Sequence, residues 1–291
     1  MLWFWLTLVS ALCMGITDTI SKKVLEQKDA LAVAWLRYLF MMIIVAPYLL
    51  AFGTLRLSGP NFWFPALIIV PLDISATIIY LNAIKMAPLS LTLPFLAFTP
   101  FFTMVISWLV LGERISQVSF LGVLLIVTGG YLLNAQKITE GIWAPFKAIW
   151  DEKAPRLILL VTLLFSISTV FGKMAVLRSS PNTMIVIYPV SYFIGISLVF
   201  LTYLRSIKPG SFTINNSLYL LAIIGALDAI SMICHFQAIS LIEISLMMSI
   251  KRLNILFGVV LGFIFFKEKQ FWRRLPATLL MLSGAILITL L

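Results

Sequence analysis

Apolar stretches of about 20 residues recur along nearly the whole chain of 291 residues, and they limit what it can fold into. An apolar α-helix of that length spans the hydrocarbon core of a bilayer, because all of its backbone hydrogen bonds are internal. Charged residues make up only 11% of the chain, whereas soluble domains average about 25%. The sequence therefore predicts an all-α integral membrane protein with few residues left for a soluble domain.

The positions of these stretches predict ten transmembrane helices, five in each half of the chain. In the first half we expect spans at Leu2–Ser21, Ala30–Ala51, Phe62–Ile84, Leu89–Val110 and Val118–Leu133. In the second half we expect them at Arg156–Val176, Met184–Leu204, Leu218–Ile239, Ile244–Phe266 and Phe271–Leu290. Residues 1–135 and 156–291 are thus predicted to form two five-helix units. Residues 136–155 form a linker that mixes tryptophans with charges, which is typical of a short interfacial helix.

The basic residues predict an orientation. Of the 21 Lys and Arg residues, 14 lie in or beside the loops after odd-numbered spans, and four lie beside those after spans 2, 4 and 6. Cytoplasmic loops carry an excess of Lys and Arg. We therefore expect a multi-pass protein of the cytoplasmic (inner) membrane with both termini outside the cytoplasm. The net charge of +10 comes from the same loops and does not indicate a nucleic-acid partner.

Residue types also exclude kinds of chemistry. Cys13 and Cys234 both fall inside predicted spans, and His235 is the single histidine, so we expect neither a metal site nor a cofactor. The sequence has no G-x-x-x-x-G-K-[ST] loop for ATP. It also lacks the spacing of a catalytic triad, and we do not expect an enzyme.

The sequence repeats itself with an offset of 155 residues. Leu72–Arg114, aligned without gaps on Leu227–Lys269, gives ten identities in 43 positions. The matched acids are Asp73 with Asp228 and Glu113 with Glu268. Because each unit has an odd number of spans, the second unit enters the membrane in the opposite direction. The prediction is therefore two inverted five-helix repeats, the architecture of alternating-access carriers.

The two units resemble the EamA branch of the drug/metabolite transporter superfamily. The resemblance rests on the acidic motifs that close the fourth span of each unit, Leu111-Gly112-Glu113-Arg114 and Phe266-Lys267-Glu268-Lys269. It extends to Pro88-Leu89-Ser90, Arg37, Gly129-Gly130 and Gly284, and it covers essentially the whole chain. It implies a ten-helix bundle around a central substrate cavity. Substrates of such carriers include amino acids, choline-like cations, nucleotide sugars and drugs, so the resemblance does not name the cargo.

Three charged residues lie near the middle of spans 8 and 9: Asp228, Lys251 and Arg252. A charge at a bilayer centre costs about 2.5–3.5 kcal/mol on insertion scales, so these side chains should face protein or water. The turn near residue 241 brings Asp228 to about the depth of Asn254. We therefore expect Asp228 to pair with Lys251 or Arg252, and the cations and Asn254 to bind an anionic group of the substrate. The alternative is a structural ion pair that fixes helix register.

Span 3 carries Asp73 at the repeat position of Asp228. By depth, Arg37 of span 2 is its best expected partner. Asp73 and Asp228 are both candidates for carrying a coupling proton. His235 is either a satisfied polar residue or a relay on that path.

Other side chains could complete the site. Those predicted to line it are Tyr80, Thr99, Tyr188 and Trp35, with bundle packing or lipid contact as the alternative. Asp18, Lys22 and Lys173 lie near the ends of spans 1 and 6 and are candidates for a gating salt bridge. The alternative for both lysines is snorkelling to the interface.

The sequence as a whole predicts a secondary active transporter. We expect alternating access that moves a small amphipathic metabolite with an anionic group, such as an amino acid, by proton coupling or exchange. The expected partners are membrane lipid and the small-molecule substrate. Gly258-x-x-x-Gly262 would let a helix approach closely, within the bundle or across a homodimer. A flippase for a lipid-linked or phosphorylated headgroup, using Lys251 and Arg252 on the phosphate, is the alternative.

Overall fold

The computed structural model of the chain describes residues 1–26, 28–52, 60–86, 93–132, 153–204, 218–258, 261 and 271–289. Helices make up nearly all of these ranges, and no strand occurs within them. The α-helices are α1 (Leu2–Leu25), α2 (Ala30–Phe52), α3 (Trp63–Met86), α5 (Thr99–Leu111), α6 (Gln117–Leu132), α8 (Lys153–Leu177), α9 (Pro181–Leu204), α10 (Leu218–Ile239), α11 (Ile244–Lys251) and α13 (Phe271–Thr289). The 3₁₀ helices η1 (Pro60–Phe62) and η2 (Leu93–Phe98) precede α3 and α5.

Among the described residues, six helices are long and apolar enough to cross a membrane: α1, α2, α3, α8, α9 and α10. Shorter apolar helices cover Phe95–Leu111, Gln117–Leu132 and Leu279–Ile288. Large apolar side chains cover the outside of the bundle; Trp5, Phe64, Leu109, Leu198 and Ile286 are each more than half exposed. Such a surface is stable against acyl chains and unfavourable in water. The chain is therefore a multi-pass membrane protein, while the count of ten spans stays a prediction.

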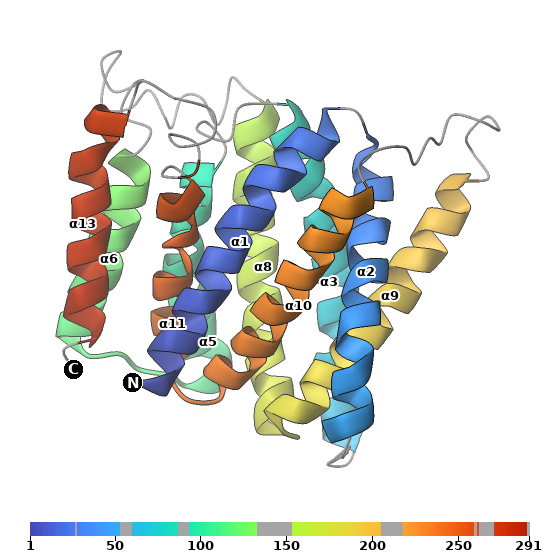
Figure 1. Cartoon of the computed structure of the whole chain (residues 1–291). Helices are drawn as coiled ribbons and strands as arrows, with labels where there is room; N and C mark the ends of the chain where they lie inside the picture. The colour runs from blue at the N-terminus through green and yellow to red at the C-terminus, as the bar shows by residue number, and fades with distance from the viewer. Residues whose placement is uncertain are drawn as a thin grey trace.

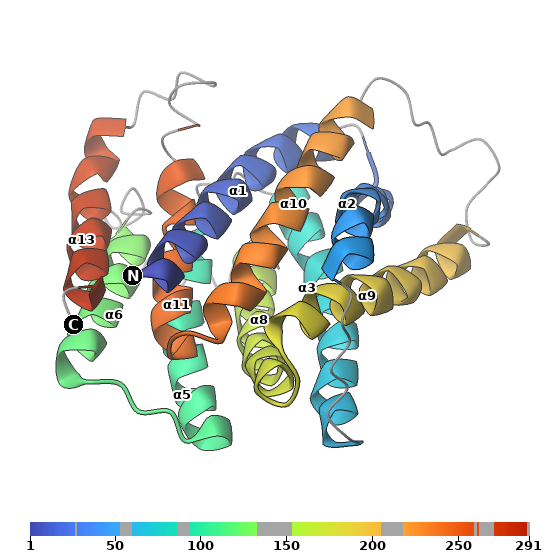
Figure 2. The same cartoon turned by 60° about the horizontal axis from the view of Figure 1, so that its bottom comes forward.

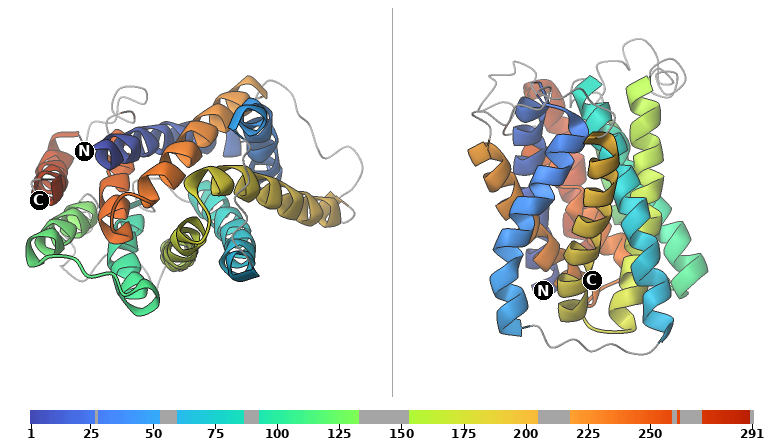
Figure 3. Two further views of the ribbon diagram at one scale, coloured as in Figure 1. Left: turned by 90° about the horizontal axis from the view of Figure 1, so that it is seen from below. Right: turned by 90° about the vertical axis from the view of Figure 1, so that its right-hand side faces the viewer.

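The helices are arranged as two end pairs with a group of helices between them. Seen along the bundle, α6 and α13 lie side by side at one end, and α2 and α9 lie together at the other (Figure 3). Between these pairs, α1 packs on α10 and α3 packs on α8. The N-terminal end of α1 and the C-terminal end of α13 lie at the same, lower end of the bundle (Figure 1). In Figure 2, α9 runs outward from the central helices, and its Ile194 and Leu198 are exposed.

Two predicted spans are broken. Span 4 is divided into η2 and α5, which begins at Thr99 after Phe98 as its N-cap residue. Span 9 is interrupted at Arg252 and Leu253, where the backbone forms turns before helix resumes at Asn254. The N–H groups at this break bond three residues back, from Leu253 to Ile250 and from Ile255 to Arg252. The cationic pair predicted for the site therefore lies at a tightened, 3₁₀-like turn and not within a regular helix.

Small residues set the closest helix contacts. A Cβ atom on Gly284 of α13 would lie 2.6 Å from the carbonyl oxygen of Gly122 in α6, and one on Gly122 would lie 2.9 Å from that of Gly284. The two backbones thus touch without intervening side chains, as small residues allow in membrane helices. Gly15 of α1 approaches span 9 in the same way, because its Cβ would lie 2.9 Å from Asn254 O and 3.4 Å from Gly258 N. Gly258 therefore packs within the bundle, against α1.

Some expectations fall outside the described residues. The interfacial helix predicted within residues 136–155 lies almost wholly in the undescribed stretch 133–152. Gly262, Glu268 and the Pro88-Leu89-Ser90 motif are also outside the described ranges. The division into repeats at 1–135 and 156–291 and their inverted relation stay predictions.

Candidate functional site

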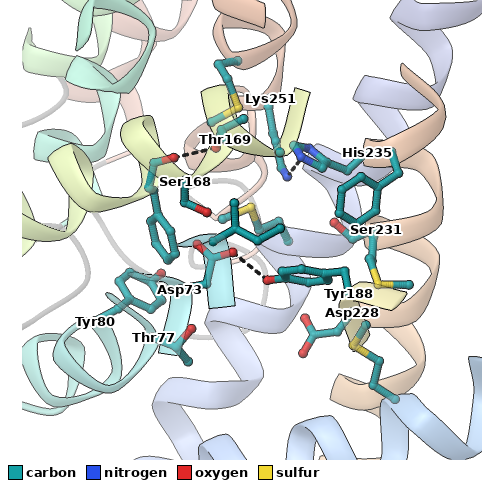
Figure 4. Close-up of a pocket in the computed structure, with 18 of the residues that line it drawn as sticks. Asp73, Thr77, Tyr80, Ser168, Thr169, Tyr188, Asp228, Ser231, His235 and Lys251 are labelled. Atoms are coloured by element: carbon teal, nitrogen blue, oxygen red, sulfur yellow. Dashed lines mark hydrogen bonds between the residues drawn. The ribbon is translucent and has the colours of Figure 1, made fainter. Parts of the chain in front are cut away.

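A cavity of about 200 Å³ lies between the central helices. Its lining comes from α1, α2, α3, α8, α9, α10 and the end of α11 (Figure 4). The sequence-predicted residues that line it are Asp18, Arg37, Asp73, Tyr80, Tyr188, Asp228, His235, Lys251 and Arg252. Most of the charged and aromatic side chains proposed from sequence thus meet around one internal space.

Arg37 of α2 pairs with Asp228 of α10 across this cavity. Its Nε donates to Oδ2 at 2.9 Å and its Nη2 to Oδ1 at 3.1 Å. This two-point contact is the strong geometry for a guanidinium and a carboxylate. The expected pairing of Asp228 with Lys251 or Arg252 is therefore wrong, and so is that of Arg37 with Asp73. Depth alone did not identify the partner, because α2 packs against α10 and places Arg37 beside Asp228.

Asp73 of α3 has a neutral partner. Its Oδ2 accepts a hydrogen bond of 2.7 Å from the Tyr188 hydroxyl of α9 (Figure 4). Within the described part of the chain, no Lys or Arg forms an ion pair with Asp73. Asp73 therefore differs from its repeat counterpart Asp228, whose charge is balanced directly.

The two cations at the span 9 break have different surroundings. The Lys251 Nζ lies 3.1 Å from His235 Nδ1 of α10, as Figure 4 shows. A charged Lys251 can only donate, so His235 then accepts at Nδ1 and carries its proton on Nε2. Arg252 is 1% exposed, and its Nε and Nη1 atoms have no hydrogen-bond partner among the described residues. A buried guanidinium with two free donors is poised to bind an anion.

Asp18 lies inside the bundle, and a gating role for it stays a prediction. The residue is 3% exposed and lines the cavity. Its Oδ1 accepts from the Tyr80 hydroxyl of α3 at 2.7 Å, and its Oδ2 accepts from Asn254 Nδ2 at 3.3 Å. Span 1 was predicted to end at Ser21, but α1 continues to Leu25 and places Asp18 deeper. Asn254 is thus connected to the cavity by its hydrogen bond to Asp18.

The two lysines proposed as gating residues lie away from the cavity lining. The Lys173 Nζ donates to the carbonyl of Ile242 at 2.6 Å and forms a salt bridge with Glu113. The second oxygen of Glu113 accepts from the N–H of Ile244 at 3.1 Å, so one carboxylate joins the ends of α5, α8 and α11. The Lys22 Nζ donates to the carbonyl of Ile84 near the end of α3 at 2.5 Å.

Two residues predicted to bind substrate are held elsewhere. The Trp35 Nε1 donates to Ser197 Oγ at 2.9 Å, and its ring stacks on Phe193 and Phe200. The Thr99 hydroxyl is fully buried and donates to Leu96 O at 2.6 Å. Neither lines the cavity.

Sequence reasoning missed part of the lining. It did not single out Tyr38, Phe165, Ser168, Thr169 or Phe236, all of which face the cavity. Tyr38 stacks on Tyr192 with ring centroids 3.7 Å apart, beside Arg37. The polar run around Ser168 in an otherwise apolar span was the available signal. Tyr38 and Phe236 carried none, because aromatic residues are common on every face of a membrane helix.

A known protein family matches the chain along nearly its whole length. The model of the EamA-like transporter family matches residues 1–135 and 154–290. The chain belongs to the EamA-like transporter family. This EamA-like chain is thereby a member of the drug/metabolite transporter superfamily. No curated protein sequence matches it significantly.

A solved structure shares the fold of this EamA-like chain. It bears the description "Crystal structure of protein" and is similar with a TM-score of 0.75. The match covers 98% of this chain and 96% of that chain at 15% sequence identity. At that identity the likeness concerns the fold alone.

Proposed function

We propose that this EamA-like protein is a secondary active transporter that moves a small amphipathic metabolite with an anionic group through the central cavity. Family membership supports transport of small molecules. The proposal of an anionic group rests on Arg252, which lines the cavity and whose buried Nε and Nη1 atoms have no hydrogen-bond partner among the described residues. Lys251, which also lines the cavity and lies 3.1 Å from His235 Nδ1, adds a second cation. The aromatic rings of Tyr38, Phe165 and Phe236 offer an apolar wall beside them.

Alternating access is part of the proposal. Figure 1 shows α1 running toward the upper end and α8 toward the lower, and α3 and α10 also run in opposite directions. Helices α1 and α8 are the first helices of the two predicted repeats, and α3 and α10 are the third helices. The contact of α1 with α10 therefore has its counterpart in the contact of α8 with α3. Both facts support an inverted pair of five-helix units that could rock around the cavity. We further propose that the protein lies in the cytoplasmic membrane with both termini outside the cytoplasm, from the basic loops.

Ligand-dependent stability tests the proposal. The detergent-purified protein is heated with amino acids, other carboxylates and phosphorylated metabolites, beside the Lys251→Gln and Arg252→Gln variants. A ligand at 100 times its Kd stabilises a protein by about 2.7 kcal/mol, so a true substrate raises the Tm by several degrees. We expect a hit that acts on the unaltered protein and is lost in Arg252→Gln. A metabolite that raises the Tm of Lys251→Gln and Arg252→Gln as much as that of the unaltered protein would contradict this binding mode.

Transport in liposomes completes the test. The metabolite found by stabilisation should be taken up by vesicles that contain the unaltered protein and not by those with Arg252→Gln. A fluorescent phospholipid in the same vesicles examines the flippase alternative. Protein-dependent movement of the lipid between leaflets, with no uptake of a soluble metabolite, would favour a flippase.

A further inference from the structure

Asp18 lies on α1, which packs against four other elements at the junction of the two predicted repeats. Helix α1, which carries it, packs against α2, α3, α10 and the α11 end of span 9. Tyr80 of α3 and Asn254 of span 9 donate to its two oxygens. The carboxylate is therefore oriented from both repeats at once.

The charges around Asp18 can be counted element by element. Arg37 of α2 and Asp228 of α10 both act on it electrostatically, but they neutralise each other in their own two-point pair. Tyr80 of α3 is a neutral donor. Arg252 of span 9 interacts electrostatically with Asp18 without forming an ion pair with it, while Lys251 of α11 and Asp73 of α3 line the same cavity. The cavity lining thus holds a balance of opposite charges that includes Asp18 and Arg252, and Asn254, two residues after Arg252, donates to Asp18.

An anion that binds Arg252 changes this balance. A second negative charge near ionised Asp18, in a space where both groups are almost fully buried, is repelled because little water screens it. A proton on Asp18 removes that repulsion and leaves the guanidinium balanced by the ligand. The proton comes from solvent and adds to one carboxylate oxygen, so one proton is taken up for each anion bound.

We propose that Asp18 is the proton-coupling residue of this transporter, and that its protonation and the binding of an anionic group at Arg252 favour each other. The proposal rests on the anion site of the proposed function and deepens it by assigning the coupled proton. Asp228 is less suited to the role because both of its oxygens already accept from Arg37. Asp73 is the rival carboxylate, since its partner Tyr188 is neutral.

Calorimetry on the full, detergent-purified chain tests this coupling. The probes are benzoate and sulfate, which stay ionised from about pH 5.5 to about pH 8.5. Titration in buffers of different ionisation enthalpy counts the protons taken up per anion. We expect uptake approaching one proton and an affinity that falls by up to about tenfold per pH unit as Asp18 loses its proton.

Three variants assign the proton. Asp18→Asn mimics the protonated acid, so it should bind the probe with high affinity at every pH and take up no proton. Asp73→Asn should keep the pH dependence of the unaltered protein. Tyr80→Phe removes a donor that stabilises the ionised acid, and it should move the pH profile upward even if Asp18→Asn fails to fold.

The outcomes distinguish a failure of the proposed anion site from a failure of the proposed proton coupling. Binding of neither probe to the unaltered chain would contradict the anion site, and with it the proposed function. Binding without proton uptake would leave that site standing and overturn the coupling. Uptake that persists in Asp18→Asn and disappears in Asp73→Asn would also overturn the proposal and assign the proton to Asp73.

Discussion

Thr99 and Asn254 stand 155 residues apart, and each is the first helical residue after the break in its span. That separation equals the offset of the sequence repeat. The Thr99 hydroxyl bonds back to Leu96 O in its own segment. The Asn254 amide reaches across to Asp18 of α1. Matching positions in the two halves therefore make different contacts: the Thr99 hydroxyl stabilises its own turn, whereas the Asn254 amide binds a carboxylate that lines the cavity.

This difference predicts unequal effects of truncation. Asn254→Ala removes a donor to a buried carboxylate, and it should destabilise the protein by about 1.5–3 kcal/mol, the usual range for a hydrogen bond to a charged group. Thr99→Ala removes a local, neutral bond and should cost about 1 kcal/mol. Thermal unfolding in one detergent compares the two. Equal losses would show that Asn254 contributes no more than a local bond.

The Arg37–Asp228 pair predicts strong non-additivity. Arg37→Gln leaves Asp228 without its cation in a largely buried place, and it should destabilise the protein by about 3–5 kcal/mol. The double variant with Asp228→Asn replaces the pair by two neutral amides and should recover much of that loss. A double-mutant cycle measured by thermal unfolding supplies the coupling energy. Additive effects would mean that the two charges act independently.

The contacts of Glu113 predict that it acts as a latch, which holds one end of the bundle closed. Glu113→Gln breaks its salt bridge with Lys173 but keeps an acceptor for the N–H of Ile244. We expect the cavity to open more often, because one tie between α5 and α8 is lost. Faster labelling of Ser168→Cys by a polar maleimide, in a background without Cys13 and Cys234, measures this. Glu243→Gln at the start of α11 is the matched control, and similar acceleration in it would contradict the latch.

The seam between α6 and α13 predicts intolerance to a single methyl group. Gly284→Ala places a Cβ 2.6 Å from the Gly122 carbonyl oxygen, which must move, and it should destabilise the protein by about 1–3 kcal/mol. Gly172→Ala is the control, because a Cβ there has no heavy atom within 4 Å. The Tm of each variant in detergent checks the contrast. Equal Tm values would show that α6 and α13 can shift enough to accommodate the added methyl group.

The location of the helices could be predicted from the sequence because bilayer thickness fixes the length of an apolar run. The clustering of charged residues around one cavity followed from the cost of exposing them to lipid. Depth along the membrane normal was used to match Arg37 with Asp73 and Asp228 with Asn254, and it did not show that Arg37 and Asp228 pair with each other. Which helices lie side by side was not, since apolar helices show little difference between their faces. Asp228 was therefore assigned to Lys251 or Arg252, although α2 supplied the nearer cation.

Helix ends and residue type account for the remaining differences between expectation and structure. Asp18 was taken as a gating residue because α1 was expected to stop four residues before Leu25. Trp35 was expected in the substrate site on residue type alone, but its ring stacks between helices α2 and α9. Residue type identified most of the residues that line the cavity, whereas the rotation of each helix about its axis determines which side chains contact one another.

The contact between Gly122 and Gly284 also bears on biogenesis. Helix α6 belongs to the first half of the chain, whereas α13 is the last described helix to leave the ribosome. Until α13 arrives, the glycine face of α6 meets lipid and not its intended neighbour. Packing of this face thus waits for translation of α13, and a chain that stalls before it would display an unfinished surface to the quality-control machinery of the membrane.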